Sequence, residues 1–339
     1  MTTEKRPELS IDGDADRTTA TIEAWRRHWT NSMTTTNSRL ASTLRFATIA
    51  LCLSSVMLAI AACGSNPSNG TSALATPTEV TNSAETAAAS SGGASSSWPD
   101  SIVVIGHSGA TGFNSDAAKS NLDVRENSWA TGTNPAVNSV YLRVLANNPA
   151  LAGHNFNLAT DGATVDDLIG QARGALALVP LPELILVQTI DNDIKCDGTD
   201  PQNYELFGDT LTEALDILAT GAPNAKVFVV TQPGTVARNA DAAEGNPSWV
   251  SNWQGDGPCD AFDPSGKRAD DKIAALQDIT DHYFAVQADR CAKFPNCSDD
   301  QGAWQRIMID AADFTPDGNH PSIQGAAERA AVTWTALYG

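Results

Sequence analysis

Short apolar runs alternate with segments of helical pattern between residues 98 and 339, and this alternation constrains the fold of the chain most strongly. The runs are rich in β-branched residues, as expected for buried strands. They lie at 101–106, 155–159, 183–189, 226–231 and, most weakly, 306–309. The helical segments lie at 136–148, 164–178, 203–220, 267–290 and 321–337. Strands that alternate with helices predict one α/β domain with a parallel sheet and helices on both of its faces.

The chain before this domain has the pattern of an export signal. Residues 46–62 form an apolar run without a charged residue, and two arginines precede it. A basic region, an apolar run and small residues at its end predict a secretory signal peptide at 33–62. Because such signals stand at the N-terminus, Met33 is the expected start and residues 1–32 are interpreted as a non-native extension.

Two other interpretations of this segment are weaker. A single membrane anchor of 17 residues would be at the short end of the spanning range of roughly 17–25 residues, and no basic cluster follows it. Arg26 and Arg27 could indicate twin-arginine export, but they lie too far from the apolar run.

Cys63 ends the apolar run in the sequence Ile-Ala-Ala-Cys-Gly. This sequence resembles the lipobox of bacterial lipoproteins, and the resemblance implies that Cys63 is diacylated and becomes the mature N-terminus. Residues 63–97 are nearly all small or polar, which predicts a flexible tether that buries no core. Two acyl chains suffice for stable anchoring. We therefore expect an extracytoplasmic bacterial protein, held at the cell membrane by its lipid anchor alone.

The chain is strongly acidic, with 21 lysines and arginines against 40 aspartates and glutamates and a net charge of −19. This charge is a poor match to a phosphate backbone, which argues against a nucleic-acid partner. It also argues against membrane contact through attraction to anionic headgroups. We expect the protein to be a monomer.

Four cysteines lie in the domain itself, namely Cys196, Cys259, Cys291 and Cys297. An even number in an oxidising compartment predicts disulfides, and four cysteines allow three pairings. The favoured pairing is Cys291–Cys297, which closes a short loop, and it leaves Cys196–Cys259. A zinc site would need close Cys-x-x-Cys pairs, which this sequence lacks, so no metal is expected.

Two fragments at opposite ends of the domain could carry chemistry. Gly106-His107-Ser108-Gly109 follows the first strand, and its glycines permit a tight turn that would present Ser108 as a nucleophile. Asp317 and His320 stand one turn apart just before the last helix. His320 could act as a general base, and Asp317 could fix its tautomer. Each fragment alone is a weak signal.

Taken together, these fragments resemble the GDSL/SGNH hydrolases. In that family a nucleophilic serine follows the first strand and a D-x-x-H motif stands near the end, with a glycine and an asparagine block between them. Residues 157–164 match the glycine block through Gly162, and residues 190–193 match the asparagine block through Asn192. The resemblance spans about 101–337. It implies an oxyanion hole formed by the backbone N–H groups of Ser108 and Gly162 and by the side-chain amide of Asn192.

The resemblance also implies the fold and the activity. The expected fold is a three-layer α/β/α sandwich with a mostly parallel, flavodoxin-like five-stranded sheet over residues 98–339. The expected activity is that of a serine esterase or lipase that works through an acyl-enzyme on a small-molecule, lipid or glycan ester, without a cofactor. A ligand-binding lipoprotein of the same fold and an acyltransferase are the alternatives.

The chain departs from the family pattern at two positions. His107 stands where the family has an aspartate, and we interpret it as structural or pocket-lining rather than as a base. Ile190 stands where the family has a glycine, which leaves open how Asn192 is aimed. The related nucleophile elbow of α/β-hydrolases would need a glycine at position 110, which is Ala110.

Two long segments without a clear pattern, 109–135 and 232–263, each follow the carboxyl end of a predicted strand. Ligands of open α/β sheets bind at this edge of the sheet. The second segment contains Trp249 and Trp253, which could form either a binding wall or a packed anchor. Acidic residues between 191 and 200 suggest a calcium loop, but the glutamate that such a loop needs at its twelfth position is Gln202. An acidic, solvated loop is the preferred interpretation.

Overall fold

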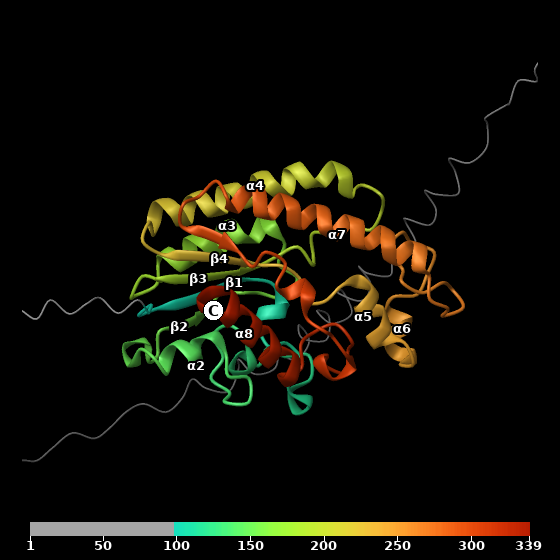
Figure 1. Cartoon of the computed structure of the whole chain (residues 1–339), viewed down its shortest axis with the longest axis horizontal. Helices are drawn as coiled ribbons and strands as arrows, with labels where there is room; N and C mark the ends of the chain where they lie inside the picture. Colours follow the sequence, from blue (N-terminus) through green and yellow to red (C-terminus); the bar gives the residue numbers. More distant parts are fainter. Residues whose placement is uncertain (1–97) are drawn as a thin grey trace, which may run out of the picture. The chain divides into compact units, whose positions relative to one another are not determined.

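The computed structural model describes residues 98–339, which form a parallel sheet covered by helices on both faces (Figure 1). The strands are β1 (Ile102–Gly106), β2 (Asn155–Asn157), β3 (Leu184–Gln188), β4 (Lys226–Val230) and β5 (Cys297–Asp299). Their order is β2-β1-β3-β4-β5 and every pairing is parallel. This is the flavodoxin-like order, so the predicted fold is confirmed. The predicted extension at 1–32, signal peptide at 33–62 and tether at 63–97 with Cys63 lie outside the described residues.

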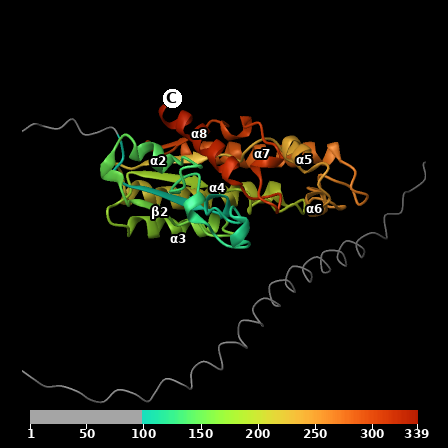
Figure 2. The same ribbon diagram turned by 90° about the horizontal axis from the view of Figure 1, so that it is seen from below.

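Two layers of helices enclose this sheet. The helices are α2 (Val140–Leu145), α3 (Val165–Leu176), α4 (Asp200–Gly221), α5 (Val236–Ala243), α6 (Pro247–Asn252), α7 (Asp270–Cys291) and α8 (Ile323–Tyr338). The 3₁₀ turns are Ser108–Ala110, Ala117–Lys119, Arg125–Asn127, Pro149–Leu151, Trp304–Arg306 and Ala311–Asp313. Helices α3, α4 and α7 cover one face, while α2 and α8 cover the other (Figures 1 and 2). Among these helices none has both the length and the apolarity to cross a membrane.

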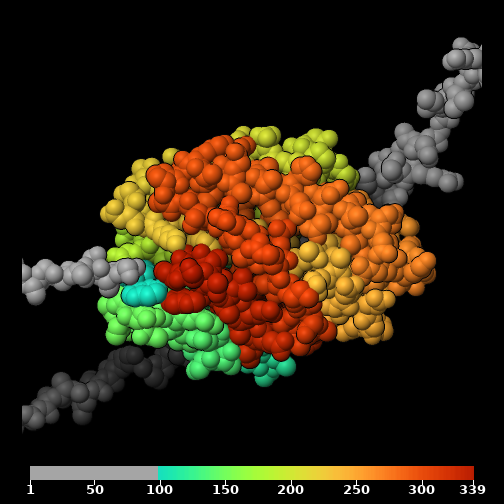
Figure 3. Space-filling model, viewed as in Figure 1, coloured from blue at the N-terminus to red at the C-terminus, as the bar shows by residue number. Residues whose placement is uncertain are grey.

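Alternate residues of the strands build two separate cores. On β1, Ile102 and Val104 face α2 and α8, whereas Val103 and Ile105 face α3, α4 and α7. All five residues of β1 are buried, which explains why the strand is continuously apolar in sequence. Burying each such side chain contributes about 1.5–3 kcal/mol, so the central strands hold the two helical layers together. In the space-filling view, the C-terminal segment that includes α8 lies across the middle of one face (Figure 3).

The fifth strand lies elsewhere than predicted. Residues 306–309 form no strand, although Ile307 and Ile309 are buried in the core beside α2 and α8. The edge strand is β5, whose three residues pair with β4 in the register Val227↔Cys297. The sequence of β5 is polar and short, so it carries no apolar signal. The Cys291–Cys297 disulfide also ties it to the end of α7.

The segment at 232–263 is more regular than predicted, because it contains α5 and α6. Both helices are short, and Asn246 caps α6 with Pro247 at its first turn. They pack with α7 in a small third core that includes Trp249 and Phe262. The Cys196–Cys259 disulfide ties this segment to the loop after β3, so the structure forms both favoured disulfides. Each disulfide contributes roughly 2–4 kcal/mol by restricting the unfolded chain.

Candidate active site

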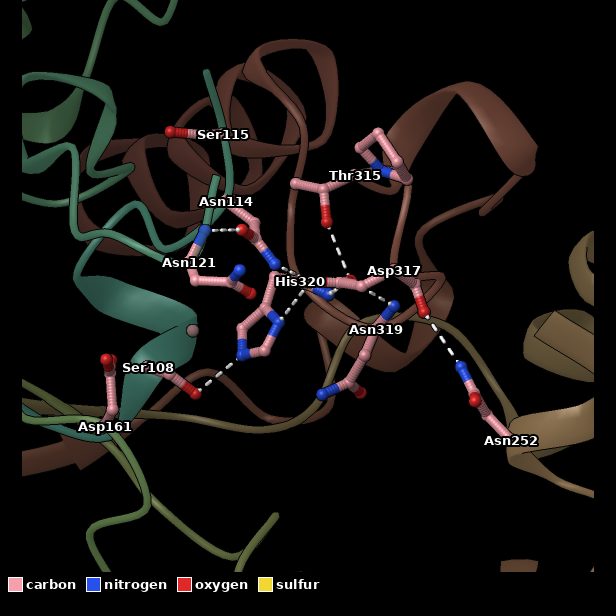
Figure 4. Close-up of polar contacts among 12 residues, drawn as sticks. Ser108, Asn114, Ser115, Asn121, Asp161, Asn252, Thr315, Asp317, Asn319 and His320 are labelled. Carbon is pink, nitrogen blue, oxygen red and sulfur yellow. Dashed lines mark hydrogen bonds and ion pairs between the residues drawn. The ribbon is translucent and has the colours of Figure 1, made fainter. Parts of the chain in front are cut away.

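Ser108 and His320 are 212 residues apart in sequence but form a direct hydrogen bond at the carboxyl edge of the sheet. The distance from His320 Nε2 to Ser108 Oγ is 2.9 Å, and that from His320 Nδ1 to Asp317 Oδ2 is also 2.9 Å. Figure 4 shows the imidazole between the hydroxyl and the carboxylate. An ionised carboxylate only accepts hydrogen bonds, so Nδ1 carries the proton and Nε2 accepts from the serine. This geometry can remove a proton from Ser108 and stabilise the resulting imidazolium.

Two glycines shape the turn that presents Ser108. Gly106 has φ +132°, and a Cβ there would lie 1.8 Å from the carbonyl oxygen of Gln188. A Cβ on Gly109 would lie 2.3 Å from the side-chain nitrogen of Gln188. His107 is buried between them, and its Nδ1 accepts a hydrogen bond from the Gly109 N–H at 3.1 Å. His107 therefore caps the turn, and in the described structure it has no hydrogen bond to Ser108.

Asp317 accepts hydrogen bonds from several donors besides the imidazole. They come from the side chains of Asn114 (2.5 Å) and Thr315 (2.7 Å) and from the backbone of His320 (3.0 Å). Burial alone would raise the pKa of Asp317, but the hydrogen bonds from His320, Asn114 and Thr315 outweigh burial and hold it well below its usual range. The carboxylate therefore stays ionised at any pH at which the protein would work.

Sequence reasoning missed two residues of the 109–135 segment that contact the triad. Asn114 donates to Asp317, and the Asn121 N–H holds the Asn114 side chain in turn. Phe113 packs against His320 with 4.7 Å between ring centroids. The only sequence signal for Asn114 was a run of turn-forming residues, and its φ of +57° fits that signal. Nothing in the sequence indicated its partner 203 residues away.

The two tryptophans that the sequence left open take different roles. Trp249 is buried, packs on the backbone of Gly318 and donates its indole N–H to the carbonyl of Pro316 at 2.9 Å. Trp249 is therefore a packed anchor for the loop that carries Asp317. Trp253 is only partly buried and lines a small cavity beside His320.

The predicted oxyanion donors lie on three segments linked by hydrogen bonds. The Asn192 amide donates to the carbonyl of Ala163 at 2.9 Å, directly after Gly162. Thr111, three residues after Ser108, donates to Asp161, directly before Gly162. Among residues 98–339 the backbone N–H groups of Ser108 and Gly162 have no hydrogen-bond acceptor. No other acceptor in this part of the chain occupies these two backbone donors, and their role in an oxyanion hole stays a prediction.

The acidic segment after β3 is solvated at Asp191 and Asp197, as expected, but two of its aspartates are buried. Asp193 is buried and accepts hydrogen bonds from Val165 N–H, Thr189 hydroxyl and Ile190 N–H. Burial raises the pKa of Asp193 to about 6, although these bonds oppose the shift. Asp200 is buried as well and accepts hydrogen bonds from two backbone N–H groups. Both side chains fix the backbone that carries Asn192. In the described part of the chain, no group of three or more potential ligands is placed to hold a metal ion.

Ile190 shows how this loop works without the glycine of the family pattern. It has φ +91°, a conformation that glycine adopts freely and a β-branched residue rarely does. Its side chain is fully buried in the core beside α3, α4 and α7. Burial of the side chain therefore offsets a backbone strain of about 1–2 kcal/mol.

Because of this strain, the glycine variant at position 190 should be more stable than the alanine variant, the reverse of the usual order. Alanine and glycine both remove the buried side chain, but only alanine keeps the strain. We expect Ile190→Gly to be about 1 kcal/mol more stable than Ile190→Ala in denaturant unfolding. The matched position is Ile185 in β3, which is equally buried at ordinary φ and where glycine should be the worse replacement. If glycine and alanine rank in the same order of stability at Ile190 and Ile185, the backbone at Ile190 is not strained.

Comparisons with known proteins give structural neighbours only. No protein-family model matches the sequence, and neither does any curated protein. Three similar solved structures are a protein of Parabacteroides merdae assigned as a GDSL-like lipase, an extracellular lipase of Streptomyces rimosus and a phospholipase A1 of Streptomyces albidoflavus. Their identities are 15%, 18% and 14%, and their TM-scores are 0.43, 0.43 and 0.45. Each match covers 70% of this chain and 95%, 99% and 97% of the other chain, respectively.

Proposed function

We propose that this chain is a serine hydrolase of carboxylic esters, an esterase or lipase of the SGNH type. The observation that supports this most directly is the continuous hydrogen-bonded chain from Ser108 through His320 to Asp317. The four motif blocks of the sequence meet at this same edge of the sheet, which is the usual ligand edge of an open α/β fold.

The proposed reaction gives each of these groups a role. Ser108 Oγ attacks the ester carbonyl while its proton passes to His320 Nε2, and ionised Asp317 stabilises the imidazolium. The N–H groups of Ser108, Gly162 and Asn192 hold the oxyanion. His320 then gives the proton to the leaving alkoxide, which departs as the alcohol. Water gives a proton to His320 as it attacks the acyl-enzyme. The bond to Ser108 Oγ then breaks, His320 returns the proton to Oγ, and the carboxylic acid leaves.

A fluorophosphonate probe tests this proposal without knowledge of the substrate. Such a probe reacts with an activated serine, so we expect a single adduct that maps to Ser108 by peptide mass spectrometry. Hydrolysis of short-chain p-nitrophenyl esters by the same preparation is the second expected result. Absence of the adduct would favour the ligand-binding lipoprotein. Transfer of the acyl group of a p-nitrophenyl ester to an added alcohol rather than to water would favour the acyltransferase.

We further propose that the enzyme is a monomer tethered through residues 63–97 to diacylated Cys63, with no nucleic-acid partner and no other contact with the membrane. The lipobox-like sequence and the acidic composition support this arrangement. A small-molecule, lipid or glycan ester would then be hydrolysed outside the cytoplasm.

If Cys63 carries the lipid anchor, its replacement should abolish fatty-acid labelling and move the protein out of the membrane fraction. In a bacterial host, the wild-type chain should incorporate labelled fatty acid and sediment with membranes. Cys63→Ala should lose the label, because no thiol remains to be acylated. Cys52→Ala, in the preceding apolar run, is the matched control and should keep it. Equal labelling of the two variants would exclude Cys63 as the lipidation site.

A further inference from the structure

Arg329 is a buried cation without a partner close to the catalytic histidine. It lies on the inner side of α8, and its side chain is shielded from solvent. Its Nε and Nη1 atoms are buried and have no hydrogen-bond acceptor. Across residues 98–339, no carboxylate forms an ion pair with it. Its Cζ lies 6.0 Å from the ring centroid of Trp304, a weak contact that supplies no acceptor to Nε or Nη1.

Packing alone does not explain an arginine at this position. The neighbouring inner residues of α8 are small, namely Gly325, Ala326 and Ala330. An apolar residue at 329 could be buried beside them without the cost of removing a charge from water. Burial lowers the pKa of Arg329 to about 10, with Asp191, Asp313 and Glu328 acting in the opposite direction, so the guanidinium is still charged at neutral pH.

The neighbouring carboxylate does not neutralise this charge by contact. Asp191 accepts a hydrogen bond from Gln232 and lies 4.0 Å from His107 Nε2. Burial lowers the pKa of His107, so this histidine stays neutral and adds no second cation. Arg329 is therefore the one fully buried positive charge at this edge of the described domain.

The surroundings of Arg329 include a small cavity next to the triad. Arg329, His320, Asn319 and Gln232 line it, together with Trp253 and Asp191. Its volume is about 80 Å³, which corresponds to roughly three water molecules. A group of a few atoms fits this space, and a long acyl chain does not. The half-exposed carboxylate of Asp191 disfavours a dianion such as a phosphate monoester more than a single negative charge.

We propose that Arg329 determines substrate specificity by binding a carboxylate that the ester substrate carries within a few atoms of the scissile bond. A carboxylate would supply the acceptors that the guanidinium lacks, and its geometry matches the fork of arginine N–H groups. The preferred substrate is then a small half-ester or an acylated hydroxy acid. This proposal rests on the proposed ester hydrolysis for its reaction, but the carboxylate site itself can be tested without turnover.

The kinetic test compares matched esters on the full chain. Monomethyl succinate against methyl pentanoate places the acid on the acyl side, and acetoxyacetate against propyl acetate places it on the alcohol side. We expect the wild type to prefer the acidic ester of one pair. Arg329→Met should lower that acid-to-neutral ratio of kcat/KM by about 10- to 100-fold, as expected for loss of a charge-assisted hydrogen bond. Arg329→Lys should recover part of it.

Arg173→Met is the matched control, because Arg173 is exposed on α3 and pairs only loosely with Glu213. It should leave both ratios unchanged. Unchanged ratios in Arg329→Met would overturn the proposal. Removal of an unpaired buried charge should not unfold the protein, and circular dichroism checks this.

The binding test uses Ser108→Ala, which cannot turn over an ester. Succinate at tens of millimolar should raise the melting temperature of this variant above that in chloride of equal ionic strength. The shift should disappear in Ser108→Ala/Arg329→Met and shrink in Ser108→Ala/Arg329→Lys. No shift in Ser108→Ala would count against the carboxylate site even if the wild type hydrolyses neutral esters. If succinate raises the melting temperature of Ser108→Ala but the wild type hydrolyses no ester, the proposed function is refuted and the carboxylate site is supported.

Discussion

Replacing Ser108 by alanine is expected to lower kcat for short-chain p-nitrophenyl esters by at least about 10⁴-fold. Without Oγ no acyl-enzyme can form, and only the oxyanion donors remain to assist the attack of water. The stability of the fold should hardly change. The conformation of the turn depends on Gly106, Gly109 and His107, and among the described residues the Ser108 hydroxyl bonds only His320.

A serine from the same region is the matched control for this loss. Ser115 directly follows Asn114, which bonds Asp317 (Figure 4). Its own hydroxyl bonds the carbonyl of Gly112 and the side chain of Asn127 instead. We expect Ser115→Ala to keep kcat within a few-fold of the wild type. Turnover by Ser108→Ala within tenfold of the wild type would mean that Ser108 is not the nucleophile.

Asp317→Asn is expected to lower kcat by about 10⁴-fold, nearly as much as loss of the serine. An asparagine can present its NH₂ group to His320 Nδ1, which then accepts a hydrogen bond and leaves the proton on Nε2. A protonated Nε2 cannot take the proton of Ser108. The graded control is Asn114→Ala, which removes one donor to Asp317 but leaves the carboxylate against His320. A larger loss in Asn114→Ala than in Asp317→Asn would contradict this role.

The same substitution should change how stability depends on pH. The pKa of Asp317 is lower in the folded chain than the value of about 3.9 expected in the unfolded chain, so its charge stabilises the fold. This contribution is complete above about pH 4 and is lost as the pH falls toward the folded-state pKa. The difference in unfolding free energy between wild type and Asp317→Asn should therefore be largest near neutral pH and shrink in acid. A pH-independent difference would count against an ionised Asp317.

The central strands were predictable because β1, β3 and β4 are buried on both faces over nearly their whole length and are apolar there, with Lys226 and Gln188 only at strand ends. The edge strand β5 was not, because its polar residues carry no such pattern and the apolar segment at 306–309 packs beside the sheet instead. Ser108, Asp317 and His320, which the structure brings into hydrogen-bond contact, could be singled out because local motifs surround them. Asn114, Phe113 and Arg329 could not, because their contacts join segments distant in sequence, which local spacing does not reveal.

Ser108 and His320 are far apart in sequence, so the order of synthesis decides when their hydrogen bond can form. A ribosome makes the chain from its N-terminus, so the strand and turn that hold Ser108 are complete long before the D-x-x-H loop and α8 emerge. A nascent or C-terminally truncated chain therefore has the hydroxyl without the imidazole. Catalytic competence would arise only as the final helix docks, which would spare neighbouring esters from attack while synthesis is still under way.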